Sequence, residues 1–298
     1  DLFPAGPGPS PGMDVTSTDI WCAGKLNRNG GWVWHRNRAS NAWEFFDPDN
    51  VFGLEPANVQ TLKIGPDNIV WLATDAGVIF YRDGRWSRMG KLNGLPSERI
   101  YDIAPFAGGA WIATDFGVAR IVASDTPIVF RPDPEEAPLP ASYPFTAIAM
   151  DKPLLYAAGA GLLLRKSGEG AFEEVDAPSV GISAAPTALF SRDQRLALGG
   201  REGFAWREEN GRWSQLSSNL WSGGAVFAID YEGGFWWLGT DRGLVKVDPE
   251  TKGTLLFGTH EGLPGSVVFS VHGEGDWLWL GTDLALVRFH WNSPRRSE

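Results

Sequence analysis

The sequence predicts an all-β fold, a seven-bladed β-propeller built from four-stranded antiparallel blades, in a chain of 298 residues. Three observations support this prediction. A short segment rich in Trp and Gly recurs seven times, the copies begin 40 to 50 residues apart, and tight-turn signals separate short strand-like segments between them. A repeat of about 40–45 residues is the usual length of a propeller blade, and short strands between glycine turns are typical of antiparallel sheet.

The repeated segment marks the second strand of each predicted blade. It is clearest at Trp71–Val78, Trp111–Val118 and Trp237–Leu244, where it reads Trp-[Leu/Ile]-[Ala/Gly]-Thr-Asp-x-Gly-[Leu/Val]. It is weaker in the fourth and fifth copies, which lack the Trp and the Thr, and an insertion follows the first copy. The seven copies begin at Trp21, Trp71, Trp111, Leu155, Ala197, Trp237 and Trp279.

The other strands of a blade follow from the residues around each copy. In the third blade, 99–103 is the expected inner strand, 110–114 the second and 118–122 the third. The outer strand shows best at 84–87 and 211–214, each entered through Asp-Gly or Asn-Gly. These dipeptides tolerate the positive φ that tight hairpin turns require.

Both ends of the chain are expected to share the last blade. After the third strand of that blade, at 286–289, the sequence offers no convincing fourth strand. We expect residues 1–3 to supply it, so that 1–3 and 266–291 form one blade and 1–298 is a single domain. Closing the ring in this way removes the seam at which unpaired strand edges would invite aggregation.

Composition and charge exclude several classes of function. The net charge is −10 and the basic residues are scattered, whereas a nucleic-acid surface needs a basic stripe. No run of about 18 apolar residues is present, so we expect no membrane span in this chain. The single cysteine, Cys22, has no partner for an internal disulfide and falls in a predicted strand, where a buried thiol is expected.

The repeated motif resembles a known family. The Trp-to-Gly segment is followed about 20 residues later by Gly-Leu-Pro-[Ser/Gly], at 94–97 and 262–265. Together the two halves resemble the two-component-regulator propeller repeats of bacteria, over essentially the whole chain. The resemblance implies a non-enzymatic recognition module outside the cytoplasm, in the periplasm or on the cell surface. It also implies a partner that is either a protein or a small ligand such as an oligosaccharide.

Residues that recur in most blades are expected first to build the blades. The repeated Trp side chains should pack between neighbouring blades, and the repeated Thr side chains should hydrogen-bond near the turn that follows. The aspartates suit that tight turn. These residues are Trp71, Trp111, Trp237 and Trp279, then Thr74, Thr114, Thr240 and Thr282, then Asp75, Asp115, Asp241 and Asp283.

The same aspartates also mark the expected binding surface. Because strands alternate in direction, the turn between second and third strands and the loop from an outer strand to the next inner strand lie on one face. Loops on a rigid scaffold usually carry binding groups, so we assign the site to this face. The candidate binding residues are Asp75, Asp115, Asp241, Asp283, His260 and Trp221, the last as an exposed contact residue in the loop before the sixth blade.

The search for chemistry is negative. No phosphate-binding or zinc-protease motif occurs, and the four histidines show no metal-ligand spacing. We therefore predict no enzyme activity, no catalytic residues, no metal site and no bound cofactor. The alternative is a structural or accessory subunit of a larger membrane or envelope complex. A propeller lyase or hydrolase ranks third, with His260 beside Glu261 as the pair to test.

Overall fold

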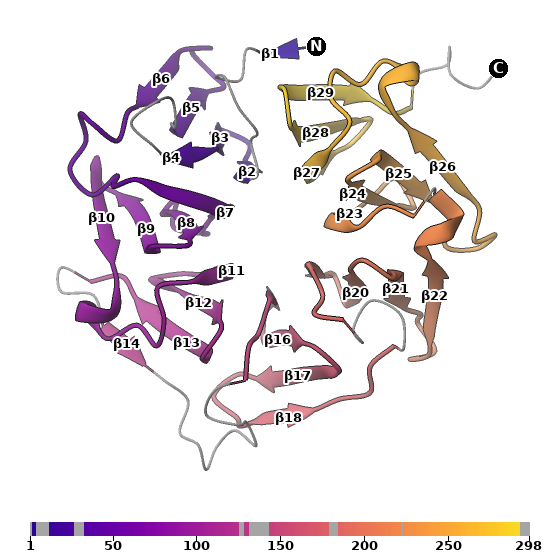
Figure 1. The fold of residues 1–298 in the computed structure, drawn as a ribbon, viewed down its shortest axis with the longest axis horizontal. Helices are drawn as coiled ribbons and strands as arrows, with labels where there is room; N and C mark the ends of the chain where they lie inside the picture. Colours follow the sequence, from indigo (N-terminus) through magenta and orange to yellow (C-terminus); the bar gives the residue numbers. More distant parts are fainter. Residues whose placement is uncertain are drawn as a thin grey trace.

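The computed structural model describes residues 2–3, 12–26, 33–124, 128–130, 143–178, 184–221 and 223–292. Its strands form seven separate antiparallel sheets arranged as blades around a central opening (Figure 1). The prediction of an all-β, seven-bladed propeller is therefore confirmed. Three single-turn 3-10 helices are the described helical elements: η1 (Lys91–Asn93), η2 (Ser218–Trp221) and η3 (Thr259–Glu261).

The inner strands surround the central opening and the second strands lie beside them. The inner strands are β2 (Gly12–Val15), β7 (Ala57–Ile64), β11 (Ile100–Phe106), β15 (Ala147–Asp151), β19 (Ala188–Arg192), β23 (Val226–Glu232) and β27 (Val268–Glu274). The second strands are β3 (Asp19–Ala23), β8 (Val70–Thr74), β12 (Gly109–Thr114), β16 (Leu154–Gly159), β20 (Arg195–Gly199), β24 (Phe235–Thr240) and β28 (Trp277–Thr282). Each second strand contains the start of a copy of the repeat, as predicted.

The third and outer strands complete the blades. The third strands are β5 (Val33–Asn37), β9 (Gly77–Arg82), β13 (Gly117–Val122), β17 (Leu162–Ser167), β21 (Gly203–Arg207), β25 (Gly243–Val247) and β29 (Leu286–His290). The outer strands are β6 (Trp43–Phe46), β10 (Arg85–Met89), β14 (Ile128–Phe130), β18 (Phe172–Glu174), β22 (Trp213–Ser217), β26 (Thr254–Phe257) and β1 (Leu2–Phe3). A further short strand, β4 (Lys25–Leu26), leaves the first blade and pairs with β7 of the second.

The ring closes through strand β1, as the sequence predicts. Leu2 pairs with Val287 and Phe3 with Leu286, so the first described strand is the outer strand of the seventh blade. A bidentate ion pair joins the seventh blade to the first: Arg38 of the first blade donates to both carboxylate oxygens of Glu274 in the seventh, at 2.7 and 3.0 Å. Arginine and carboxylate match geometrically in this arrangement, which makes it stronger than a single contact.

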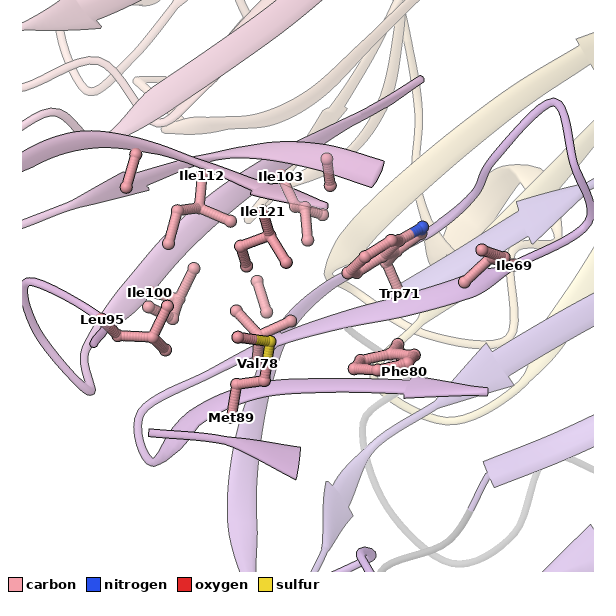
Figure 2. Packing of buried hydrophobic residues seen from close by; sticks show 13 residues of the cluster. Ile69, Trp71, Val78, Phe80, Met89, Leu95, Ile100, Ile103, Ile112 and Ile121 are labelled. Atoms are coloured by element: carbon pink, nitrogen blue, oxygen red, sulfur yellow. The ribbon is translucent and has the colours of Figure 1, made fainter. Parts of the chain in front are cut away.

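The core consists of apolar clusters between neighbouring blades. Figure 2 shows the cluster between the second and third blades, where Trp71 packs with Phe80, Ile103 and Ile112. Trp237 is buried between the sixth and seventh blades, and Trp279 between the seventh and first. Trp111 is partly buried against the cluster of the third and fourth blades. The predicted role of the repeated Trp as the packing residue between blades is confirmed.

The repeated Thr closes the turn after each strong second strand. Thr240 Oγ1 donates to the carbonyl of Gly243 at 2.9 Å and accepts the N–H of Arg242 at 3.1 Å. Thr74, Thr114 and Thr282 make the equivalent pair of hydrogen bonds. All four hydroxyls are buried, so the turn geometry is fixed from inside the blade. Within the part of the chain that the structure describes, no helix is long and apolar enough to cross a membrane.

Candidate binding face and central channel

One face of the ring carries both kinds of loop that the sequence places together; we call it the loop face. It consists of the turns between second and third strands and the connections from each outer strand to the next inner strand. Backbone hydrogen bonds join the two kinds directly: Gly77 N–H donates to the carbonyl of Glu98 at 2.6 Å, and Ser218 N–H to that of Glu202 at 2.9 Å. In the second and fifth blades, the turn and the connection that follows the outer strand are therefore joined directly on the loop face.

Three of the four candidate aspartates are used to build this face. Asp75 Oδ1 accepts the backbone N–H of Asn58 at 2.7 Å. Asp241 and Asp283 accept the N–H groups of Ala225 and Val267 at 2.9 and 3.1 Å. In each blade the carboxylate thus holds the residue that leads into the inner strand, so the role of these residues in the loop geometry is observed directly. Binding by them stays a prediction.

Asp115 differs from its three counterparts. Its Oδ1 is buried, and no described residue hydrogen-bonds it. The backbone N–H that would match the others belongs to Arg99, and it donates to Ser97 Oγ at 3.0 Å instead. The exposed Arg99 side chain lies close by: its pKa is raised mainly by a hydrogen bond with Tyr101 and further by the charges of Asp115 and Asp75.

His260 lies on the exposed turn η3 of the loop face, but its neighbour Glu261 is occupied. The Glu261 carboxylate accepts the N–H of Gly258 at 2.7 Å, which closes the turn. Asn93 does the same for Gly90 in η1, and in both motifs the glycine that follows has a positive φ, 94° in Gly94 and 93° in Gly262. The Gly-Leu-Pro signature is thus a loop-forming device, and His260 and Glu261 are not arranged as an acid–base pair.

The expectation that Trp221 is an exposed contact residue is wrong. Its side chain is 2% exposed, packs in the core of the fifth and sixth blades, and donates its Nε1–H to the carbonyl of Gly224 at 2.9 Å. The 3-10 turn η2 points this ring into the core and leaves the preceding Leu220 exposed instead.

Exposed apolar side chains gather on the loop face. Among the described residues, seven large apolar side chains are exposed, and five of them lie in loop-face turns and connections. The other two, Phe45 and Leu255, lie in outer strands, and none lies in the described hairpins of the opposite face. The five are Phe52, Leu92, Phe116, Leu220 and Leu284, with exposed fractions between 50% and full exposure.

The loop face opens into a central channel of about 480 Å³, lined by residues of the inner strands. Four inner strands carry a β-bulge near their first residues, at the ends that adjoin the loop face. A bulge leaves one residue without a cross-strand partner and redirects its side chain. The four unpaired residues all line the channel: Gln60, Tyr101, Phe227 and Phe269. Strands β7 and β11 face β23 and β27 across the opening (Figure 1).

Buried and partly buried carboxylates link the inner strands around the channel. Asp230 accepts the N–H of the next residue, Tyr231, at 2.8 Å and the N–H of Gly273 in the following blade at 2.6 Å. Asp14 and Asp102 make the same two kinds of contact. Their donors in the following blade are Ile64 for Asp14 (2.8 Å) and Ile148 for Asp102 (2.9 Å). We call these three carboxylates the inter-blade clamps.

The clamp at Asp102 has an unusual acidity. Burial raises the pKa of this carboxyl from the ordinary 3.8 to about 6, although the charge of Lys63 and the N–H groups of Ile148 and Ile103 act in the opposite direction. A perturbed carboxyl in a concave site is a feature of functional sites, but structural networks perturb acidity as well. Here both oxygens already accept backbone hydrogen bonds, which assigns Asp102 to the clamp.

The channel also contains a histidine beside a carboxylate. His272 Nδ1 lies 3.6 Å from Asp14 Oδ1, a pair that sequence reasoning missed because the two residues come from the seventh and first blades. Both Asp14 oxygens accept backbone N–H groups, and no described hydroxyl or thiol is hydrogen-bonded to His272. Among the described residues, no group of three or more His, Cys, Asp or Glu side chains could hold a metal ion.

Comparison with known proteins agrees on the fold. No protein-family model and no curated protein matches the chain. Solved structures do. The extracellular domain of the hybrid two-component system BT4673 of B. thetaiotaomicron superposes with a TM-score of 0.73 at 16% identity, covering 98% of this chain and 40% of that one. PorZ, a surface component of the type-IX secretion system of Porphyromonas gingivalis, gives 0.67 at 11% identity, with 99% and 38% covered.

A third similar structure is YCF48 bound to D1 peptide, with a TM-score of 0.67 at 14% identity, which covers 97% of this chain and 94% of that one. This chain therefore spans about 40% of the length of the sensor and secretion-system proteins and nearly all of YCF48. At such low identity the likeness shows the fold alone. The solved structures that share this fold include extracellular domains of two-component systems.

Proposed function

We propose that this chain is a non-enzymatic recognition module that binds a protein partner through its loop face, outside the cytoplasm. The observation that carries the proposal is the placement of Phe52, Leu92, Phe116, Leu220 and Leu284 on that face. Scattered exposed apolar side chains are ordinary on a protein surface, but a one-sided distribution around a rigid mouth is typical of an interaction surface.

The side of the ring supports recognition over a purely structural role. A structural subunit packed edge-on in a larger complex would need a large apolar patch on its outer strands. In outer strands β6, β10, β18, β22 and β26, whose side chains the structure describes, the exposed large apolar side chains are Phe45 and Leu255, in blades one and six. The location outside the cytoplasm is supported by the extracellular and surface proteins that share this fold.

The channel argues against a catalytic role for its histidine. A general base needs a carboxylate or carbonyl that orients it and a reacting group within hydrogen-bond reach. His272 lies 3.6 Å from Asp14, beyond hydrogen-bond distance, and the two Asp14 oxygens hold backbone N–H groups of two blades. The arrangement is that of a structural carboxylate with a neighbouring histidine.

Site-specific photo-crosslinking in the source cell tests the proposal. A photoreactive amino acid at Leu92 or Leu284 should give a discrete crosslinked protein, and the same label at Leu255 on the side of the ring should not. Combined Leu92→Ser and Phe116→Ser replacement should remove a crosslink formed from Leu284, while Phe45→Ser leaves it intact. Equal crosslinking from the loop face and the side, or from neither, would reject the loop face as the binding surface.

A further inference from the structure

An aromatic pair lies at the mouth of the channel, outside the apolar clusters between blades. Phe227 and Phe269 are the bulge residues of β23 and β27, in neighbouring blades, and their rings lie 5.7 Å apart at 31°. Both side chains are only partly buried and both line the channel. The bulges direct two apolar rings toward a cavity that water can enter, instead of into the clusters between blades. A regular strand would avoid this, so the pair is a candidate contact surface for a ligand.

Charged side chains lie one level deeper in the channel. In the strand register, Asp230, His272, Asp14 and Lys63 each pair with the Trp of the neighbouring second strand, which places them at one level in four consecutive blades. Asp230 already has a cationic partner, Arg192, at 2.7 Å. Asp14 has the His272 ring nitrogen Nδ1 as a neighbour, 3.6 Å from its Oδ1.

The channel as a whole is acidic. Its lining includes four carboxylates, from Asp14, Asp102, Asp151 and Asp230, against one lysine and one arginine, Lys63 and Arg192. An excess of two negative charges in a concave, partly desolvated site attracts cations more strongly than the same charges on an open surface. The protein as a whole carries a net charge of −10, which acts in the same direction.

A polar group without a partner lies between these two levels. Ser270 follows Phe269 in the strand and precedes His272 by two residues, so that it lies on the same side of β27 as the histidine. Its side chain is 9% exposed and lines the channel, and no described residue hydrogen-bonds its hydroxyl oxygen. Buried polar groups are almost always paired, so an unpaired one beside a cavity indicates a missing donor or acceptor.

We propose that the channel binds a small organic ammonium compound, with its apolar body against Phe227 and Phe269 and its ammonium group directed toward Asp14. The aromatic rings stack against the apolar body, and the carboxylate level below them attracts the positive charge. The hydroxyl of Ser270 can accept one ammonium N–H. A volume of about 480 Å³ suits a ligand of this size. This site is separate from the loop-face apolar residues, and it goes beyond the proposed function.

Three probes that share a phenyl ring and a short chain test the charge preference. In calorimetric titrations at low salt, 2-phenylethylamine should bind about ten-fold or more tightly than 2-phenylethanol, and phenylacetate should not bind, because the acidic channel attracts only the ammonium and repels a carboxylate. The affinity for the amine should fall as salt is added, because the attraction is partly screened. Equal affinity for the amine and the alcohol, or no binding of the amine, would overturn the proposal.

Variants locate the site. Replacing Phe227 and Phe269 together by Leu keeps an apolar lining but removes stacking with the phenyl ring of the probe, and should weaken amine binding about five-fold or more. Lys63→Met removes an opposing charge from an exposed side chain and should tighten it, which keeps the test valid even if the double variant folds poorly. The matched control, Phe52→Leu, lies on the loop face outside the channel lining and should leave amine affinity unchanged.

These measurements are independent of the proposed function. Loop-face crosslinking should persist in the Phe227→Leu, Phe269→Leu variant if the two sites are separate. Amine binding that is unchanged in this variant and in Lys63→Met would place the amine elsewhere and reject the channel site, without bearing on the loop face.

Discussion

Removing one inter-blade clamp is expected to weaken the whole ring. Asp230 is 3% exposed, accepts the N–H groups of Tyr231 and Gly273 at 2.8 and 2.6 Å, and pairs with Arg192 at 2.7 Å. Asp230→Ala leaves two backbone donors without their acceptor and removes the carboxylate beside Arg192, whose guanidinium still donates to the Tyr231 carbonyl. Hydrogen bonds to a charged group contribute about 1.5–3 kcal/mol each, and the ion pair adds about 1 kcal/mol or less because the Arg192 side chain is 41% exposed.

Because these terms overlap, we expect a total loss of about 4 kcal/mol in the free energy of unfolding for Asp230→Ala. Domains are usually stable by only about 5–15 kcal/mol, so the variant should unfold at a much lower urea concentration. The change is measured by urea titration followed through tryptophan fluorescence, since most of the repeated Trp side chains are buried between blades.

Two comparisons make this test specific. Asp248 also accepts two backbone N–H groups, from Glu250 and Thr251, but within one hairpin, so Asp248→Ala should cost much less. Combining Asp230→Ala with Arg192→Met should cost less than the sum of the single changes, because both changes remove the same ion pair. A loss below about 1 kcal/mol for Asp230→Ala would show that the clamps do not hold the blades together.

Three further predictions concern stability. The pKa of the Asp102 carboxyl is about 6 in the folded protein and about 3.8 in the unfolded chain, so protonation of this carboxyl stabilises the fold at low pH. This stabilisation is lost as the pH rises through 6. Relative to wild type, Asp102→Asn should therefore be about 2 kcal/mol less destabilising at pH 7 than at pH 4 in urea titrations. Gly77→Ala should lower the free energy of unfolding by about 3 kcal/mol or more, because φ is +109° and a Cβ would lie 2.1 Å from the Met89 carbonyl oxygen. Gly117→Ala lies in the same turn of the next blade, where a Cβ would have no atom within 4 Å, and should lower it by only about 1 kcal/mol. Similar losses for the two variants would contradict the steric argument. Trp71→Ala should lower the unfolding free energy by about 3–5 kcal/mol, and a loss near zero by thermal or urea denaturation would mean that this residue is not the packing element between blades.

The blade architecture could be predicted because it repeats. A Trp followed three residues later by Thr and then by Asp-x-Gly fixes strand, turn and packing residue within a short stretch of chain, and each copy supports the others. The weak copies at Leu155 and Ala197 could be placed by spacing alone, since a ring of strong blades leaves room only for blades between them. The structure confirms both as second strands.

The chemistry of the channel could not be predicted in the same way. The clamps and the His272–Asp14 pair join different blades, up to 258 residues apart in sequence, and no local pattern encodes the partner of a given carboxylate. Trp221 was misplaced because a loop position suggested exposure, while one turn of 3-10 helix turns the ring inward. The bulges that direct Phe227 and Phe269 into the channel share a pattern that can be recognised in the sequence: an aromatic residue follows the buried valine at the start of both inner strands.

The pairing of β1 with β29 has a consequence for how the protein is made. During synthesis the residues of β1 leave the ribosome before those of every other described strand, yet their partners at Leu286 and Val287 are among the last of the described chain to appear. Six blades can assemble from neighbouring segments as they emerge, but the seventh must wait for a contact between distant parts of the polypeptide, which is the slow kind of step in folding. Until then the newly made ring remains an open arc, and this is the stage at which a chaperone would be of most use to it.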